Sequence, residues 1–331
     1  MSQKPNHLYP EQAPYETGFF DAGDGHQLYY ARYGNPAGEP VVYLHGGPGA
    51  GCRFNEYRFF DMSHYNVLLF DQRGAGKSQP FASISHNDLN ALIGDLEKLR
   101  ERFSFVSWNV TGGSAGSLLG MFYAVRHPER VKRLLLRGIF FGDATGAYNL
   151  INAEGPLKKS RNQWFQEYYE HIPASERTDN GLIMAYYNRL MSANDTIAIE
   201  AARLFTRWDS SIVTKDPQLE ALDMLNQNPR SCLPISRLFF HYTVNEYMKN
   251  NYKPYLLSEV SKLSMPIDII HGRQDWICPV ENAIELHEHC PATHLTIVEN
   301  TGHGMVEPGL QQAFIRITDQ WKTVKASSQP A

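Results

Sequence analysis

Short apolar runs recur along the chain, separated by stretches whose apolar residues repeat at helical spacing. The runs occupy residues 41–44, 67–70, 134–136, 267–270 and 294–298. Each of the first four leads into a turn that contains glycine or aspartate. Nearly continuous apolar runs of this length are typical of parallel strands covered on both faces. The pattern therefore predicts a mostly parallel sheet.

The stretch at 89–103 has the period of a helix. From Leu92 to Phe103 its apolar residues recur three or four positions apart, which places them on one helical face. Either Asn87 or Asp88 is suited to cap its N-terminus. Because strand-like and helix-like segments alternate along the chain, we expect an α/β fold with a doubly wound sheet.

The middle of the chain has a different pattern. Between about residues 143 and 254 strand-like runs are absent, and aromatic and charged residues recur at helical spacing. Strand-like runs then resume at Ile267. An all-helical insertion between two halves of a sheet is typical of a cap that controls access to a site, although most of its aromatic residues belong to its own core. The predicted organisation is a core domain of residues 1–142 and 255–331 with a helical cap domain of residues 143–254.

Composition narrows the class of protein. The 331 residues carry a net charge of −4 and contain no dense block of Lys or Arg, so a nucleic-acid or anionic-membrane partner is not expected. The N-terminal residues lack the apolar stretch of a signal peptide, and the four cysteines form no Cys-x-x-Cys pair. We therefore expect a cytoplasmic protein with reduced cysteines, no metal and no cofactor, acting on a small molecule or a short peptide.

One glycine-rich string marks a candidate nucleophile. Residues 112–116 read Gly-Gly-Ser-Ala-Gly, after a short apolar run and before a helix-like run. This is the G-x-S-x-G pattern of a nucleophile elbow, in which a serine stands on a sharp strand-to-helix turn. The flanking glycines let neighbouring backbone approach without a Cβ clash. Ser114 is the predicted nucleophile.

A serine nucleophile needs a base, and that base needs an orienting acid. In elbow hydrolases the chain order is Ser, then Asp or Glu, then His. Asp275 follows the 267–270 run, and His303 lies in a glycine-flanked loop after the last run. Both should reach the same sheet edge as Ser114. Asp268, inside a predicted strand, and Asp143, after an earlier one, remain alternative acids.

A second glycine-rich string follows the 41–44 run. Residues 45–49 read His-Gly-Gly-Pro-Gly, at the position where elbow hydrolases place one oxyanion donor. Together with the residue after the nucleophile, this predicts the backbone N–H groups of Gly47 and Ala115 as the oxyanion hole. Residues 74–78 resemble a phosphate-binding loop, but Asp71 stands where that motif requires glycine. We interpret them as a turn.

With these motifs the chain resembles the prolyl aminopeptidase (proline iminopeptidase) family of α/β-hydrolases. The resemblance extends over about residues 17–321 and rests on strings at 33–36, 45–49, 71–74, 112–114, 136–140, 271–275 and 302–303. It implies an α/β-hydrolase fold and removal of N-terminal proline from short peptides without a metal. It also implies that Ser114, Asp275 and His303 form the catalytic triad.

The chain differs from the family at several positions that bind the substrate in that family. The family holds the substrate's charged nitrogen with two cap glutamates; here Asp209 stands at one and Phe239 at the other. Ala115 replaces a tryptophan, and Thr243 replaces an aromatic residue of the proline pocket. The implied substrate-binding residues are Asp209, Phe140, Phe239, Thr243 and Cys278.

Three functions follow from these patterns. The first is an aminopeptidase that releases N-terminal proline or another small residue, which Asp209 favours. The second is an esterase or amidase for an uncharged or apolar acyl group, which Phe239 and Ala115 favour because a lost carboxylate weakens selection of a cation. The third, a binding protein without catalysis, is disfavoured by the complete triad. For the aminopeptidase, Glu246 or Glu154 is a candidate for the missing second carboxylate.

Overall fold

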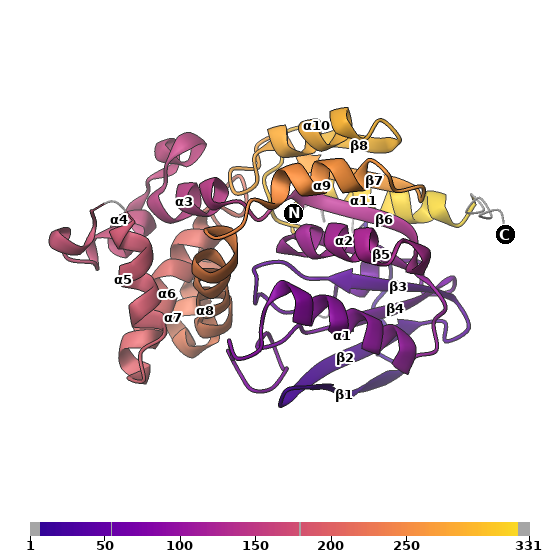
Figure 1. Cartoon of the computed structure of the whole chain (residues 1–331), viewed down its shortest axis with the longest axis horizontal. Coiled ribbons are helices and arrows are strands. Elements are labelled where there is room, and N and C mark those ends of the chain that lie inside the picture. Colours follow the sequence, from indigo (N-terminus) through magenta and orange to yellow (C-terminus); the bar gives the residue numbers. More distant parts are fainter. Residues whose placement is uncertain (1–6, 54, 179, 324–331) are drawn as a thin grey trace, which may run out of the picture.

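A computed structural model describes residues 7–53, 55–178 and 180–323. It contains an eight-stranded sheet with the strand order β1-β2-β4-β3-β5-β6-β7-β8, shown in Figure 1. The strands are β1 (Glu16–Gly23), β2 (His26–Gly34), β3 (Glu39–Leu44), β4 (Tyr65–Phe70), β5 (Trp108–Ser114), β6 (Val131–Ile139), β7 (Ile267–Gly272) and β8 (Thr293–Val298). Strand β2 pairs antiparallel with both β1 and β4, and all other pairs are parallel.

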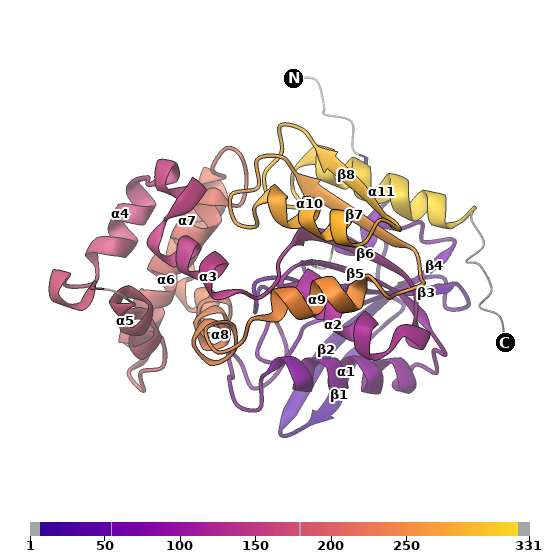
Figure 2. The same ribbon diagram turned by 45° about the horizontal axis from the view of Figure 1, so that its top comes forward.

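Helices cover both faces of the sheet, which explains the continuous apolar strands. One face packs against α1 (Leu89–Arg102), α2 (Ala115–Arg126) and α10 (Val280–His289), with α9 (Tyr252–Val260) over α2. The other packs against α11 (Pro308–Trp321) and the short helix η1 (Glu56–Phe59), as Figure 2 shows for α11. Neighbouring residues such as Val41 and Val42 therefore point into different parts of the core. The predicted doubly wound α/β fold is confirmed.

A hydrogen bond identifies the N-terminal capping residue of helix α1. The Asp88 side chain accepts from the amide N–H of Ala91 at 2.8 Å, so Asp88 is the capping residue. The buried Asn87 instead connects two parts of the molecule. Its side-chain oxygen accepts from the hydroxyl of Tyr242, and its backbone oxygen lies 2.9 Å from a ring nitrogen of His241.

Between β6 and α9 the chain is helical, and these helices gather to one side of the sheet (Figure 1). They are α3 (Ala144–Asn152), α4 (Gln163–Glu170), α5 (Gly181–Leu190), α6 (Asp195–Ile212), α7 (Leu219–Gln227) and α8 (Leu233–Tyr242). Short turns η2 (Pro128–Arg130), η3 (Gly155–Ser160), η4 (Ala174–Glu176), η5 (Pro229–Cys232) and η6 (Thr243–Tyr247) complete the helical elements. Helix α9 packs against α2 and α10, and the expected domain boundary at 254–255 falls inside it.

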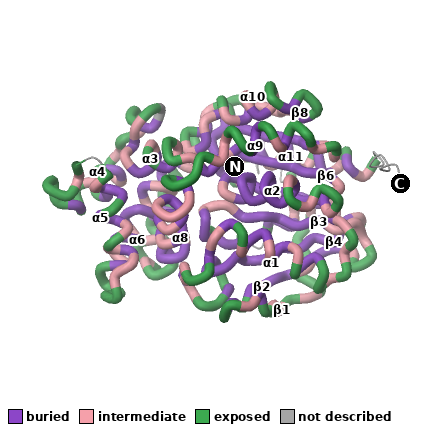
Figure 3. The backbone as a smooth tube through the Cα atoms, in the orientation of Figure 1, coloured by how far each residue is buried: buried purple, intermediate pink, exposed green. Residues whose placement is uncertain are grey.

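The interior of this helical region is aromatic. Tyr168 stacks on Tyr186 with ring centroids 4.4 Å apart, and Phe205 meets Phe240 edge to face at 4.9 Å. All four are buried, so these side chains are core residues. In Figure 3 the buried backbone continues from the sheet into α6 and α8. Across the described ranges, no helix is long and apolar enough to cross a membrane.

Candidate active site

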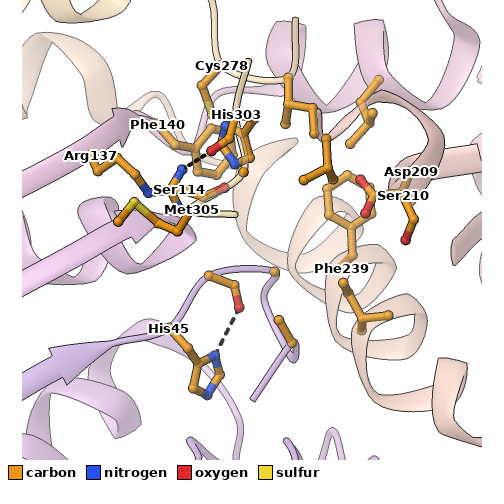
Figure 4. A pocket seen from close by; sticks show the side chains of 18 of the residues that line it. His45, Ser114, Arg137, Phe140, Asp209, Ser210, Phe239, Cys278, His303 and Met305 are labelled. Atoms are coloured by element: carbon orange, nitrogen blue, oxygen red, sulfur yellow. Dashed lines mark hydrogen bonds between the residues drawn. The ribbon is translucent and has the colours of Figure 1, made fainter. Parts of the chain in front are cut away.

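One cavity lies where the strand ends, the helical cap and the loop after β8 meet. It is lined by Gly47, Ser114, Phe140, Asp209, Phe239, Cys278 and His303 among the residues singled out from the sequence. Figure 4 shows most of these side chains around it. Asp275 is buried behind His303, while Ala115 and Thr243 do not line the cavity. Thr243 is fully buried, and its hydroxyl donates to the backbone oxygen of Phe239 at 2.8 Å.

Ser114 stands on a strained turn between β5 and α2. Its φ of 58° and ψ of −125° are unusual for a residue with a side chain. The turn is tight because Gly112 and Gly116 have no side chains. A Cβ on Gly112 would meet the carbonyl oxygen of Gly116, and one on Gly116 would meet that of Leu44. This local geometry explains the glycine spacing and directs Ser114 into the cavity.

His303 and Asp275 form a close pair. Nδ1 of His303 lies 2.7 Å from Oδ2 of Asp275, whose Oδ1 accepts from the amides of Ile277 at 3.0 Å and Cys278 at 2.8 Å. Burial alone would raise the pKa of Asp275, but the His303 charge, the His303 hydrogen bond and the other contacts outweigh it and lower that pKa. Asp275 is therefore an ionised partner that orients the imidazole.

Gly138 leaves room for this pair. It has a φ of +55°, and a Cβ built there would lie 3.0 Å from Cε1 of His303 and 3.4 Å from Oδ2 of Asp275. A larger residue would press on both the histidine and the carboxylate. The glycine of the 136–140 string therefore has a steric role in the site.

A second histidine, His271, supports the same carboxylate and was not singled out from the sequence. Its Nδ1 accepts from the amide of Ile139 at 3.2 Å, and its Nε2 donates to the backbone oxygen of Cys278 at 2.7 Å. Nε2 also lies 3.4 Å from Oδ2 of Asp275. Burial lowers the pKa of His271. These contacts fit a neutral imidazole with the proton on Nε2, which braces the loop that carries Asp275.

The histidine loop is tied to the cap. The amides of His303 and Gly304 both donate to the backbone oxygen of Val213, at 2.9 and 2.8 Å. Oε1 of Glu307 accepts from the amides of Gly302 at 3.0 Å and Lys215 at 2.9 Å. The His303 backbone is thus held by the cap segment 213–215. Its carbonyl oxygen also accepts from Nη1 of Arg137 at 2.5 Å.

The loop after β3 is held by its own histidine. Nδ1 of His45 lies 2.9 Å from the backbone oxygen of Gly46, and Nε2 accepts from the amide of Gln72 at 3.0 Å. The Gln72 side chain donates to the backbone oxygen of His45 at 2.9 Å. Burial lowers the pKa of His45, so a neutral imidazole fits these contacts. The segments 45–49 and 71–74 are therefore joined by hydrogen bonds.

The same turn explains the resemblance to a phosphate loop. The Asp71 carboxylate accepts from the amides of Cys52 at 2.7 Å and Lys77 at 2.8 Å. A Cβ on Gly76 would collide with that carboxylate. The Asp71 carboxylate therefore occupies the Lys77 amide and the space beside Gly76, in agreement with our interpretation of residues 74–78 as a turn.

Two backbone amides are available beside Ser114. The Gly47 amide donates no hydrogen bond within the described part of the chain. Ala115 is the first residue of α2, and the first amides of a helix have no partner inside it. Gly46 brings the two loops together, since a Cβ there would lie 3.0 Å from Cβ of Ser114. The arrangement can hold an anionic oxygen next to the serine.

The Ser114 hydroxyl makes no hydrogen bond to His303 in the described chain and lies instead near the Cys278 thiol. Burial and the Asp275 charge raise the pKa of that thiol well above its usual value. Serine–histidine contacts are often loose in enzymes without substrate and tighten in the complex.

Asp209 is a carboxylate without a partner. Within the described residues it forms no hydrogen bond or ion pair, although it lines the cavity. Burial raises its pKa to about 7. Asp209 is only partly exposed, at the cavity wall (Figure 4). A cation that entered the cavity would find an unpaired acceptor here.

Neither candidate for the second acid faces Asp209. Glu154 pairs with Arg161 at 2.6 Å, and Glu246 accepts from the hydroxyl of Tyr252; both lie outside the cavity lining. The second acidic residue of the cavity is Glu56 of η1, which the sequence did not reveal. Its signal was weak, because a lone glutamate in a loop is usually exposed.

Apolar rings form much of the remaining wall. Phe140 packs edge to face on Tyr247 at 5.2 Å, and Phe239 stacks on Phe205 at 5.1 Å. Both phenylalanines line the cavity. In the described ranges, no cluster of His, Cys, Asp and Glu is arranged to hold a metal ion.

The fold and the cavity define a class of enzyme, and comparison with known proteins agrees. A family model described as alpha/beta hydrolase fold matches residues 39–309. The crystal structure of a hydrolase from Pseudomonas aeruginosa PA01 superposes with a TM-score of 0.64 and 16% identity, covering 94% of this chain and 99% of that one. At that identity the likeness shows the fold alone. The class is that of the α/β-hydrolases.

Closer relatives define the family. The chain is 38% identical over 317 residues to a proline iminopeptidase of Xylella fastidiosa, covering 95% of this chain and 99% of that protein. It is 36% identical over 331 residues to a proline iminopeptidase of Arabidopsis thaliana, covering 96% and 82%. The chain therefore belongs to the proline iminopeptidase family of α/β-hydrolases and is a serine hydrolase.

Proposed function

We propose that this enzyme is an aminopeptidase that releases N-terminal proline, or another small residue, through an acyl-enzyme on Ser114. The observation that carries the proposal is the unpaired Asp209 carboxylate in the same cavity as Ser114 and His303. A substrate bound through its cationic amine at Asp209 would present the adjacent carbonyl carbon to the serine. The relatives named proline iminopeptidase support the same substrate class.

The proposed chemistry uses the groups described above. Ser114 Oγ attacks the carbonyl carbon while Nε2 of His303 takes its proton, and Asp275 stabilises the imidazolium that forms. The carbonyl oxygen becomes an oxyanion that the amides of Gly47 and Ala115 hold. His303 then protonates the leaving nitrogen, the C–N bond breaks, and the acyl group remains on the serine. Water, deprotonated by His303, hydrolyses that ester and restores the enzyme.

A second function is favoured by specific residues. Phe239 and Phe140 give the cavity an apolar wall. An esterase or amidase for an uncharged acyl group would use the same Ser114, His303 and oxyanion groups. The two functions differ in whether the enzyme binds a cationic amine of the substrate.

The experiment that separates them compares proline p-nitroanilide with a short-chain p-nitrophenyl ester. We expect clear turnover of the anilide, and loss of both activities in Ser114→Ala. Fast ester hydrolysis with no anilide hydrolysis would refute the aminopeptidase proposal. Unchanged activity of Ser114→Ala would refute the assignment of the nucleophile itself.

A further inference from the structure

The cavity has a second charged wall that the proposed mechanism does not use. Arg53, Glu56 and Arg137 all line it, together with the buried Tyr43. Arg137 is 8% exposed, yet it forms no ion pair within the described residues. Its one hydrogen bond there is from Nη1 to the backbone oxygen of His303. A buried guanidinium without an acidic partner at a cavity wall is suited to an anionic ligand.

Arg137 lies beside the nucleophile and away from Asp209. A Cβ on Gly113, the residue before Ser114, would collide with the Arg137 guanidinium. Figure 4 shows Arg137 and Asp209 on opposite sides of Ser114. The two charges therefore differ in sign and stand on either side of the position where a scissile carbonyl would bind.

In this binding mode the leaving group lies on the side of Ser114 that faces Arg137. His303 must deliver its proton to the leaving nitrogen, and Arg137 is bonded to the His303 backbone. If the substrate amine binds Asp209, the residue after the scissile bond extends away from Asp209 past His303. In a dipeptide, the terminal carboxylate lies within about 3.8 Å, one residue length, of that nitrogen.

From this geometry, and resting on the proposed aminopeptidase function, we propose that Arg53 and Arg137 form a subsite for the C-terminal carboxylate of a dipeptide substrate. Arg137 supplies a buried guanidinium next to the nucleophile. Arg53 supplies an exposed one at the same wall, with no ion pair in the described chain. A substrate with a free carboxylate directly after the leaving nitrogen is then bound at both ends.

Glu56 affects how strongly this wall binds an anion. Its carboxylate accepts from the Arg53 amide at 3.1 Å but forms no ion pair with either arginine among the described residues. Burial raises the pKa of Glu56 to about 7, against opposing effects of Arg53 and Arg137. An ionised Glu56 would repel a bound carboxylate, so it weakens the subsite as pH rises.

The test compares Pro-Gly with Pro-Gly amide, which differ in the terminal charge. For each enzyme variant, the ratio of the two kcat/KM values removes effects common to both substrates. We expect Arg53→Gln to lower the dipeptide-to-amide ratio about three- to tenfold, the range of a partly exposed charge-assisted contact. We expect Glu56→Gln, which keeps the acceptor oxygen, to raise the ratio. Arg230→Gln, an exposed arginine of the cap surface outside the cavity, is the matched control.

The outcomes separate this subsite from the proposed function. A ratio in Arg53→Gln equal to that of the wild type would overturn the subsite while both substrates are still cleaved. Failure of the wild-type enzyme to cleave either substrate would overturn the aminopeptidase proposal and the subsite with it. Thermal melts of Arg53→Gln verify that the variant is folded.

Discussion

Asp209 is the residue at which stability and proposed function conflict. A carboxylate buried without a partner is unfavourable when ionised, and burial raises its pKa to about 7. The same isolation suits Asp209 to the cationic amine that we propose it binds. Natural active sites often keep such unfavourable groups because the ligand satisfies them.

Replacing Asp209 with Asn should therefore have opposite effects on stability and activity. The folded-state pKa of Asp209 is raised, so the cost of ionising it grows as pH rises from about 4 to about 7 and is constant above that. We expect Asp209→Asn to raise Tm by about 2–5 °C at pH 8 and by little at pH 5. We expect kcat/KM for proline p-nitroanilide to fall about 10- to 100-fold. Melting curves at pH 5 and pH 8 measure the change in Tm, and initial rates measure the change in kcat/KM. An equal gain in Tm at the two pH values would contradict the expected cost of ionising Asp209.

Gly138 offers a second test at the residue scale. A side chain there would adopt a positive φ and press on His303, so Gly138→Ala should cost roughly 1 kcal/mol of stability and lower kcat about tenfold. Gly94 in α1 has open space around its Cα, and Gly94→Ala is expected to be neutral or stabilising. Equal kcat values for the two variants would argue against a steric role for Gly138.

Some site residues could be predicted from the sequence and others could not. Ser114, Asp275 and His303 follow strand ends in a fixed order, so their placement at one edge of the sheet follows from topology. His271, Glu56 and Glu307 act through partners distant in sequence or through backbone amides, and no local pattern marks such contacts. Thr243 was expected at the cavity from the family resemblance, but the turn of the helix directs its hydroxyl to Phe239.

At the scale of elements, the loop that carries His303 is hydrogen-bonded to the cap as well as to the sheet domain. Its amide and that of Gly304 share the Val213 oxygen, and Glu307 bridges Gly302 and Lys215. The position of the histidine therefore depends on the cap segment 213–215.

Removing this bridge should affect turnover more than binding. We expect Glu307→Ala to lower kcat about 10- to 100-fold with a smaller change in KM, because a displaced base loses alignment. Glu307→Gln keeps an oxygen that accepts from both amides and should retain most of the activity. Glu299→Ala, which removes a surface pair with Arg273, is the control. A similar loss in Glu307→Gln and Glu307→Ala would show that the negative charge, and not the hydrogen bonds, matters.

Sequence patterns predicted the elements unevenly. Central strands such as β3 and β4 contain continuous apolar runs, residues 41–44 and 67–70, because both faces are covered. The β1–β2 hairpin was not predicted. Strand β1 is an antiparallel edge strand that alternates exposed and half-buried residues, so it contains no continuous apolar run. The helical content of the middle segment was predicted from its lack of strand-like runs. The start of α9 at Tyr252 reflects packing on α2 and α10 that no local signal encodes.

At the scale of the whole molecule, the cavity places unlike charges around one nucleophile. Asp209 comes from the cap, Ser114 and Arg137 from the sheet, and His303 from a loop bonded to both. The proposed acyl transfer uses groups of the sheet and of the His303 loop, and that loop is itself held by the cap segment 213–215. The proposed selection of a substrate with a free amine rests on Asp209, which the cap supplies.

Hydrolysis of proline p-nitroanilide, compared with that of its N-acetylated form, tests this claim most directly. Acetylation removes the positive charge that Asp209 is proposed to bind and leaves the proline ring and the scissile bond in place. We expect wild-type kcat/KM to be at least about 100-fold higher for the free amine, and we expect Asp209→Asn to narrow the difference. Equal rates for the two substrates, or faster hydrolysis of the acetylated one, would contradict it.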